Sequence, residues 1–161
     1  MTSFISAVQT CGQRIYSVEI TEDGYSLFQK LLSEISEAIT STAFQYAKGS
    51  GDNAVEALEI QRASSSHISH VLAQYALMEG MKAIMKANIV PDETADRWEI
   101  VDMTPEQMND AITASGLIFP VIDMFQEMKN RDPSVPVAFR AAMYLAAMLQ
   151  YLATKLLEAV F

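Results

Sequence analysis

The segment VPVAFRAAMYLAAMLQYLATKLLEAVF, residues 135–161, is the most apolar part of the chain and decides the fold. On a helix its few polar residues share one narrow stripe, so most of the helix surface is apolar. Only fourteen residues lie between Arg140 and Lys155, which is too few to span a bilayer. We therefore expect no membrane span, and we place this helix either at the centre of a bundle or against a second copy of the chain. The polar stripe contains Arg140, Gln150, Thr154, Lys155 and Glu158.

A second copy would cover the surplus apolar surface of this helix, so a homo-oligomer, in the simplest case a homodimer, is one expectation. A monomeric mass by light scattering at high concentration would rule it out. The residues predicted for self-association are Tyr144, Met148, Tyr151 and Leu152.

The residues before this segment also repeat at the helical period of 3.6. One helix starts at residue 21 or 26 and ends at KGSG (48–51), where glycine can adopt a left-handed cap. The next helical region, 52–88, changes the direction of its apolar stripe across Arg62–Ser66. This change predicts a kink, a π-bulge or a break between two helices, because serines compete with the helix backbone for hydrogen bonds.

One kinked helix or two separate helices are expected between residue 104 and the linker that precedes the apolar segment. TPEQ (104–107) is a helix start, in which Thr104 can cap the first turn and Gln107 completes a capping box. Pro120 must then kink this helix or start a new one. NRDPSVP (130–136) forms a linker to the apolar segment.

These elements predict a mainly α fold, one domain over residues 1–161 built as a bundle of five or six helices. Two short stretches alternate between apolar and polar residues instead, RIYSVEI (14–20) and RWEIV (97–101). They could pair as one short two-stranded ribbon, which would be stable only if it packed on the helices.

The chain has 11 basic and 20 acidic residues, a formal net charge of −9. Nucleic acids and anionic membrane surfaces are bound through basic faces, so neither is expected as a partner. The negative net charge favours a protein partner with a basic surface.

Cys11 is the single cysteine, so no intramolecular disulfide or cysteine-based zinc site can form, which suits a reducing, cytoplasmic location. The Ser- and Thr-rich N-terminus also suits export by a non-classical bacterial route.

The acidic residues gather between positions 92 and 110, where seven carboxylates are offset by Arg97 alone. Such a segment is typical of a solvated connector and a helix start, and it could also dock a basic partner. Phe44 lies opposite the apolar stripe of its helix, so it is either covered by a second layer of structure or exposed as an apolar anchor. The residues expected to bind the partner are Asp96, Trp98, Glu99, Asp102 and Phe44.

Ten methionines are many for a chain of 161 residues. Met78, Met81 and Met85 share one helical region, where Val71 and Tyr75 continue the apolar stripe. Methionine fills irregular cores and also makes adaptable binding surfaces. Core filling is the expectation here, and a surface that grips other helices is the alternative.

His67 and His70 are the only histidines, and their spacing makes them neighbours on a helix. They could hold one metal ion only with further ligands, and neither E-x-x-H nor H-E-x-x-H occurs. The chain also lacks a G-x-S-x-G elbow and a phosphate-binding glycine loop. We therefore expect no catalytic residue, no metal site, no cofactor and no enzyme activity.

The leading hypothesis is a non-enzymatic helical protein–protein interaction module, such as an adaptor, a secretion chaperone or an inhibitor. Two alternatives stay open: an exported structural or assembly subunit, and a metal-dependent enzyme centred on His67 and His70.

Overall fold

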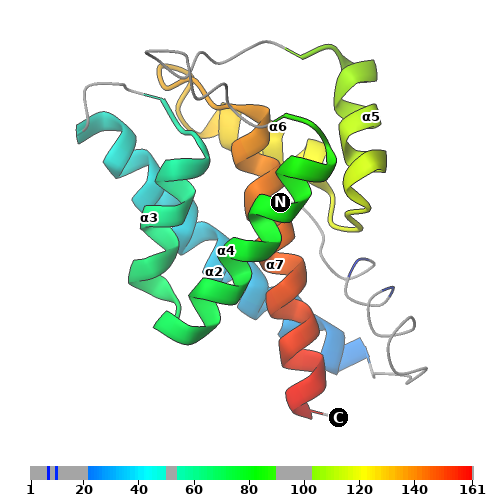
Figure 1. The fold of residues 1–161 in the computed structure, drawn as a ribbon. Helices are drawn as coiled ribbons and strands as arrows, with labels where there is room; N and C mark the ends of the chain where they lie inside the picture. The colour runs from blue at the N-terminus through cyan, green and yellow to red at the C-terminus, as the bar shows by residue number, and fades with distance from the viewer. Residues whose placement is uncertain (1–6, 8–9, 11–21, 50–53, 90–102, 161) are drawn as a thin grey trace.

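The computed structural model describes residues 7, 10, 22–49, 54–89 and 103–160. Six helices fall within this part of the chain, and the mainly helical bundle is confirmed (Figure 1). They are α2 (Glu22–Gly49), α3 (Ala57–His67), α4 (His70–Lys86), α5 (Pro105–Ser115), α6 (Val121–Arg131) and α7 (Phe139–Val160).

The apolar segment at the end of the chain forms α7, which is the central helix of the bundle. α7 packs against α4, α6, α3 and α2, and Figure 1 shows it running through the middle of the molecule, with α4 in front of it and α2 behind. Each large apolar side chain buried in this way stabilises the fold by about 1.5–3 kcal/mol relative to an exposed one. The large side chains of α7 that are fully buried are Met143, Tyr144, Leu145, Met148, Leu149 and Leu157.

The region predicted to change direction breaks into two helices. The break is at Ile68 and Ser69, shortly after the predicted Arg62–Ser66, and Ile68 has an extended backbone (φ −127°, ψ 146°). The first helix begins at Ala57 and not at Asp52, because Glu56 and Glu59 form a capping box there. In that box the Glu56 N–H donates to Glu59 Oε2 over 2.9 Å.

The helix boundaries in the second half of the chain follow the predicted signals. Thr104 Oγ1 accepts from the Gln107 N–H over 3.2 Å, and Gln107 Oε1 accepts from the Thr104 N–H over 3.0 Å. α5 ends at Ser115 and is capped by Gly116, which has a left-handed backbone (φ 72°). Pro120 immediately precedes α6, so of the two predicted outcomes a new helix is the one observed.

The described residues contain no β-strand, only an isolated parallel bridge between Val55 and Val137. The two segments predicted to pair as a ribbon, 14–20 and 97–101, lie outside the described residues. The bridge ties the start of α3 to the start of α7, with the Val55 N–H donating to the Pro136 carbonyl over 2.9 Å.

A buried ion pair reinforces the same junction. Arg140, in the first turn of α7, donates from Nε to Glu56 Oε2 over 2.7 Å and from Nη2 to Glu56 Oε1. The side chains of Arg140 and Glu56 are only 14% and 7% exposed. A single carboxylate therefore caps α3 and neutralises an arginine of the central helix.

Two exposed ion pairs join α2 to the end of α6. Arg131 donates from Nη2 and Nη1 to the two carboxylate oxygens of Glu37, over 2.6 and 2.8 Å, and the Lys48 ammonium lies 2.8 Å from Asp132 Oδ2. The Lys48 hydrogen bond is the main reason that the pKa of Asp132 falls to about 2, and the Ser134 hydroxyl and N–H add to it. The Arg131 hydrogen bond lowers the pKa of Glu37 as well.

We expect acid to weaken the fold through Asp132. Because the pKa of Asp132 is lower in the folded chain, its contribution to stability is present above its ordinary value of 3.8 and is lost as the pH falls toward about 2. The free energy of unfolding, measured with urea between pH 4.5 and 2.5, should fall less steeply in Asp132→Asn than in the wild type. Lys48→Met should flatten the pH dependence too, since it removes the main donor. Equal slopes in all three proteins would contradict this assignment.

Candidate protein interface

Helix α4 turns its small residues inward and its large apolar residues outward. Four of its five buried residues are Ala73, Ala76, Gly80 and Ala83, and the fifth is Ile84. On the opposite side, five large apolar side chains are between 37% and 65% exposed. Their spacing of three or four residues places them on one face. We call this set the α4 face: Val71, Tyr75, Met78, Met81 and Met85.

The close approach of α4 to α7 explains why the inward side is small. A Cβ atom added at Gly80 would lie 2.7 Å from the ring of Tyr144, so no larger residue fits without a shift. The Tyr144 hydroxyl also donates to the Leu77 carbonyl over 3.0 Å. Burial raises the pKa of Tyr144 to about 12, so the phenol keeps the proton that it donates. This contact sets the rotation of α4 and leaves its large side chains in solvent.

The exposure of the α4 face differs from the expectation that the methionines of this helix fill the core. Single exposed apolar residues are common, whereas five on one helix face form a contiguous patch of the kind that marks an interaction site. Its exposed side chains include three of the ten methionines. The sequence carried a signal for this arrangement, the second stripe of small residues at 73, 76, 80 and 83.

Helix α3 extends the apolar surface beside the α4 face. Gln61 Nε2 lies 4.0 Å from Met81 Sδ, which brings the exposed side of α3 next to the face. Leu58, one turn before Gln61, is also exposed.

Phe44 is buried and not exposed as an anchor. It is 4% exposed, and the Arg131 guanidinium lies 5.8 Å from the centre of its ring. Of the two predicted arrangements, covering by a second layer is therefore the one observed, because the end of α6 lies over this side of α2. The other residues predicted to bind a partner, Asp96, Trp98, Glu99 and Asp102, lie outside the described residues.

The residues predicted for self-association lie mainly inside the chain. Tyr144, Met148 and Leu152 are buried, and Tyr151 is half-buried with the Lys155 ammonium 5.5 Å from the centre of its ring. In the structure the other helices of the same chain cover this side of α7, so it is not open to a second copy.

The two histidines contact different residues of the same chain. His67 Nε2 lies 2.7 Å from Thr42 Oγ1 on α2, and His70 Nε2 lies 3.2 Å from Gln74 Nε2 on α4. In the described part of the chain, no three His, Cys, Asp or Glu side chains group closely enough to hold a metal ion.

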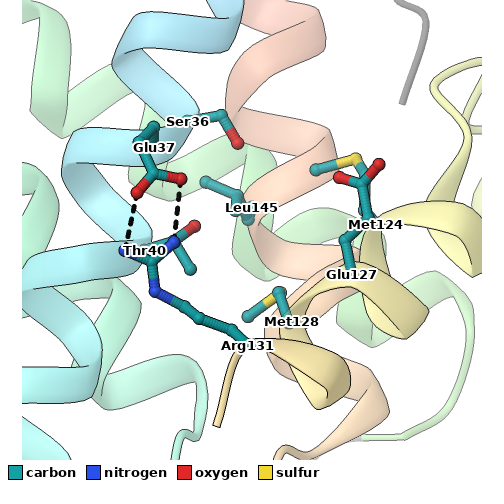
Figure 2. A pocket seen from close by; sticks show the side chains of 8 residues that line it. All are labelled: Ser36, Glu37, Thr40, Met124, Glu127, Met128, Arg131 and Leu145. Carbon is teal, nitrogen blue, oxygen red and sulfur yellow. Dashed lines mark hydrogen bonds and ion pairs between the residues drawn. The ribbon is translucent and has the colours of Figure 1, made fainter. Parts of the chain in front are cut away.

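A shallow pocket of about 70 Å³ lies between α2, α6 and α7. Figure 2 shows the Glu37–Arg131 ion pair bordering it, with Met124, Met128 and Leu145 on its other sides. Sites for small organic ligands are usually about 300–1,000 Å³, so this pocket has room only for a few water molecules.

Comparison with known proteins gives one partial similarity. No model of a known protein family matches the chain. The chain is 46% identical over 46 residues to a histone of Dictyostelium discoideum, a stretch that covers 29% of this chain. The chain thus spans about a third, 32%, of the length of this curated relative.

Among the described residues, no helix is both long and apolar enough to cross a membrane.

Proposed function

We propose that this chain is a non-enzymatic helical interaction module that binds another protein through the α4 face. The observation that carries this proposal is the orientation of α4, with alanine and glycine against α7 and Val71, Tyr75, Met78, Met81 and Met85 in solvent. An adaptor, a chaperone and an inhibitor would all use such a face. A basic partner of the acidic segment that contains Asp96, Trp98, Glu99 and Asp102 remains a separate prediction.

The energetics of the α4 face suit a docking surface. Each large apolar side chain that a partner buries contributes about 1.5–3 kcal/mol before the costs of association are subtracted. Aromatic residues are frequent interface anchors, and methionine adapts its shape to the surface that it meets. Counted from Val71, the five side chains lie at i, i+4, i+7, i+10 and i+14, a helical spacing of the kind that helices use as anchors in protein interfaces.

Met78→Glu is the sharpest test, because Met78 lies at the middle of the α4 face. We expect it to lower the capture of specific partners from a lysate of the native host at least tenfold, since it places a charge at the centre of an apolar contact. The free energy of unfolding should change by less than about 0.5 kcal/mol, as is usual for an exposed position. Quantitative pull-down measures the first effect and urea unfolding the second.

The matched control is Leu27→Glu on α2, because Leu27 is 69% exposed and lies on another helix. This variant should retain the partners that Met78→Glu loses. If both variants retained the same partners as the wild type, the α4 face would not be the binding surface.

The similarity to a histone favours a second candidate, a protein subunit of a DNA-packaging assembly. Histone octamers hold DNA through arginines inserted into its minor groove. Here Arg131 and Arg140 bind Glu37 and Glu56, and the formal net charge is −9, so such a subunit would join the assembly through protein contacts. Mass spectrometry of the proteins captured in the same pull-down, after nuclease treatment, separates the candidates. Histones that stay bound would support the second candidate, and partners without histones would support the first.

A further inference from the structure

On α3 and α4 the charged side chains at the surface are mainly cations, whereas the whole chain is acidic. On α3 and α4 the exposed or half-exposed charged side chains are three cations, Arg62, Lys82 and Lys86, and one carboxylate, Glu79. Glu59 is buried at the start of α3. The surface charges of α3 and α4 are therefore mainly positive, on a chain with a formal net charge of −9.

The cations border the apolar residues along one edge. At 100° per residue, Lys82 and Lys86 lie on the same side of α4 as Tyr75, and Glu79 lies farther out. The Lys82 ammonium is 3.2 Å from Glu79 Oε1, in an exposed pair three residues apart. Exposed pairs of this kind contribute little to stability, so Lys82 can exchange Glu79 for a carboxylate of a partner.

The length of the α4 face limits the size of the occupant. From Val71 to Met85 it covers fourteen helical steps, which at 1.5 Å each is about 21 Å. A partner helix of about four turns would cover it, with apolar residues over Met78 and Met81 and polar residues along the lysine edge.

We infer that the α4 face binds an amphipathic helix whose apolar stripe is bordered by Asp or Glu on the side that meets Lys82 and Lys86. This inference rests on the proposed function and adds the chemistry of the partner. A basic helix would bring like charges together at the same edge, which disfavours binding. A nucleic acid fits less well, because the centre of the face is apolar and offers the phosphates no donors.

The experiment uses the full chain and two synthetic helical peptides of about four turns. Both carry the same leucine stripe, and one has glutamate along the stripe edges where the other has lysine. We expect fluorescence anisotropy to show at least tenfold tighter binding of the glutamate peptide at 50 mM NaCl and a much smaller difference at 500 mM. The double variant Lys82→Glu/Lys86→Glu should reverse the preference. Lys30→Glu, a lysine-to-glutamate change at an exposed position on α2, should not.

Equal binding of the two peptides would overturn the inferred charge of the partner and leave the apolar docking face intact. Binding of neither peptide would overturn the amphipathic helix as occupant, whereas the Met78→Glu pull-down judges the proposed function by itself. Phosphatidylserine vesicles serve as a further probe. If the chain bound them and not the glutamate peptide, the face would serve a membrane surface and the inference would be wrong.

Discussion

Replacing Arg140 with methionine is expected to lower the free energy of unfolding by about 3–5 kcal/mol, because it leaves a carboxylate buried without its partner. Glu56 is almost completely covered, and Arg140 binds both of its oxygens. Methionine preserves most of the apolar volume of the arginine, so the loss reports the missing charge more than a cavity. Urea unfolding followed by circular dichroism at neutral pH measures it.

Arg131→Met is the matched control, because Arg131 also forms a two-point pair with a glutamate. That glutamate, Glu37, is 65% exposed, and exposed pairs typically contribute about 0–1 kcal/mol. We expect the control to lose less than about 1 kcal/mol. Similar losses of unfolding free energy in Arg131→Met and Arg140→Met would show that the burial of Glu56 does not cause the large effect expected for Arg140→Met.

The double variant Glu56→Leu/Arg140→Met tests the mechanism further. Removing both charges abolishes the desolvation penalty, so the double variant should be more stable than Arg140→Met alone. It should still be less stable than the wild type by about 1 kcal/mol, because Glu56 caps α3 and leucine cannot.

Gly80→Val is expected to destabilise the chain by about 1–3 kcal/mol through overpacking at the contact between α4 and α7. Even the first added carbon would lie 2.7 Å from the Tyr144 ring, and valine adds two more. The ring cannot move away freely, because Tyr144 is fully buried and its hydroxyl is bonded to the Leu77 carbonyl. Partner binding should weaken as well, since a displaced α4 no longer presents the same face.

Gly49→Val is the control for this prediction. Gly49 is the last residue of α2, and a Cβ atom there would meet nothing within 4 Å. The same substitution at this open position should change the free energy of unfolding by less than about 1 kcal/mol. Urea unfolding compares the two variants, and an equal loss in both would show that the Tyr144 contact does not determine the effect.

The sequence was a good guide wherever the signal was local. The capping box at Thr104 depends on residues within one turn, and the structure has it. Pro120 starts a new helix, which is one of the two outcomes predicted for it. The break between α3 and α4 was predicted within a few residues, because serines close to it signalled a change. The start of α3 was placed too early, because Glu56 is recruited both as a cap and as the partner of Arg140, 84 residues away.

The candidate site was harder to predict, because it depends on distant residues. Phe44 has the same helical position whether α6 covers it or solvent does, so the sequence left both options open. Tyr144 and Met148 were predicted to face a second copy, and instead the other helices of the same chain cover them. In both cases the deciding contact joins elements that are far apart in the sequence.

The sequence alone was enough to predict that the chain is mainly helical and that its most apolar segment has to be covered on nearly all sides, by its own chain or by a second copy. Which side of α4 is buried depends instead on its packing against α7. Helical periodicity places Val71 and Met78 on one stripe and Ala76 and Gly80 on another, and both stripes are apolar. Tyr144 leaves room only for the small stripe, so the large side chains remain in solvent.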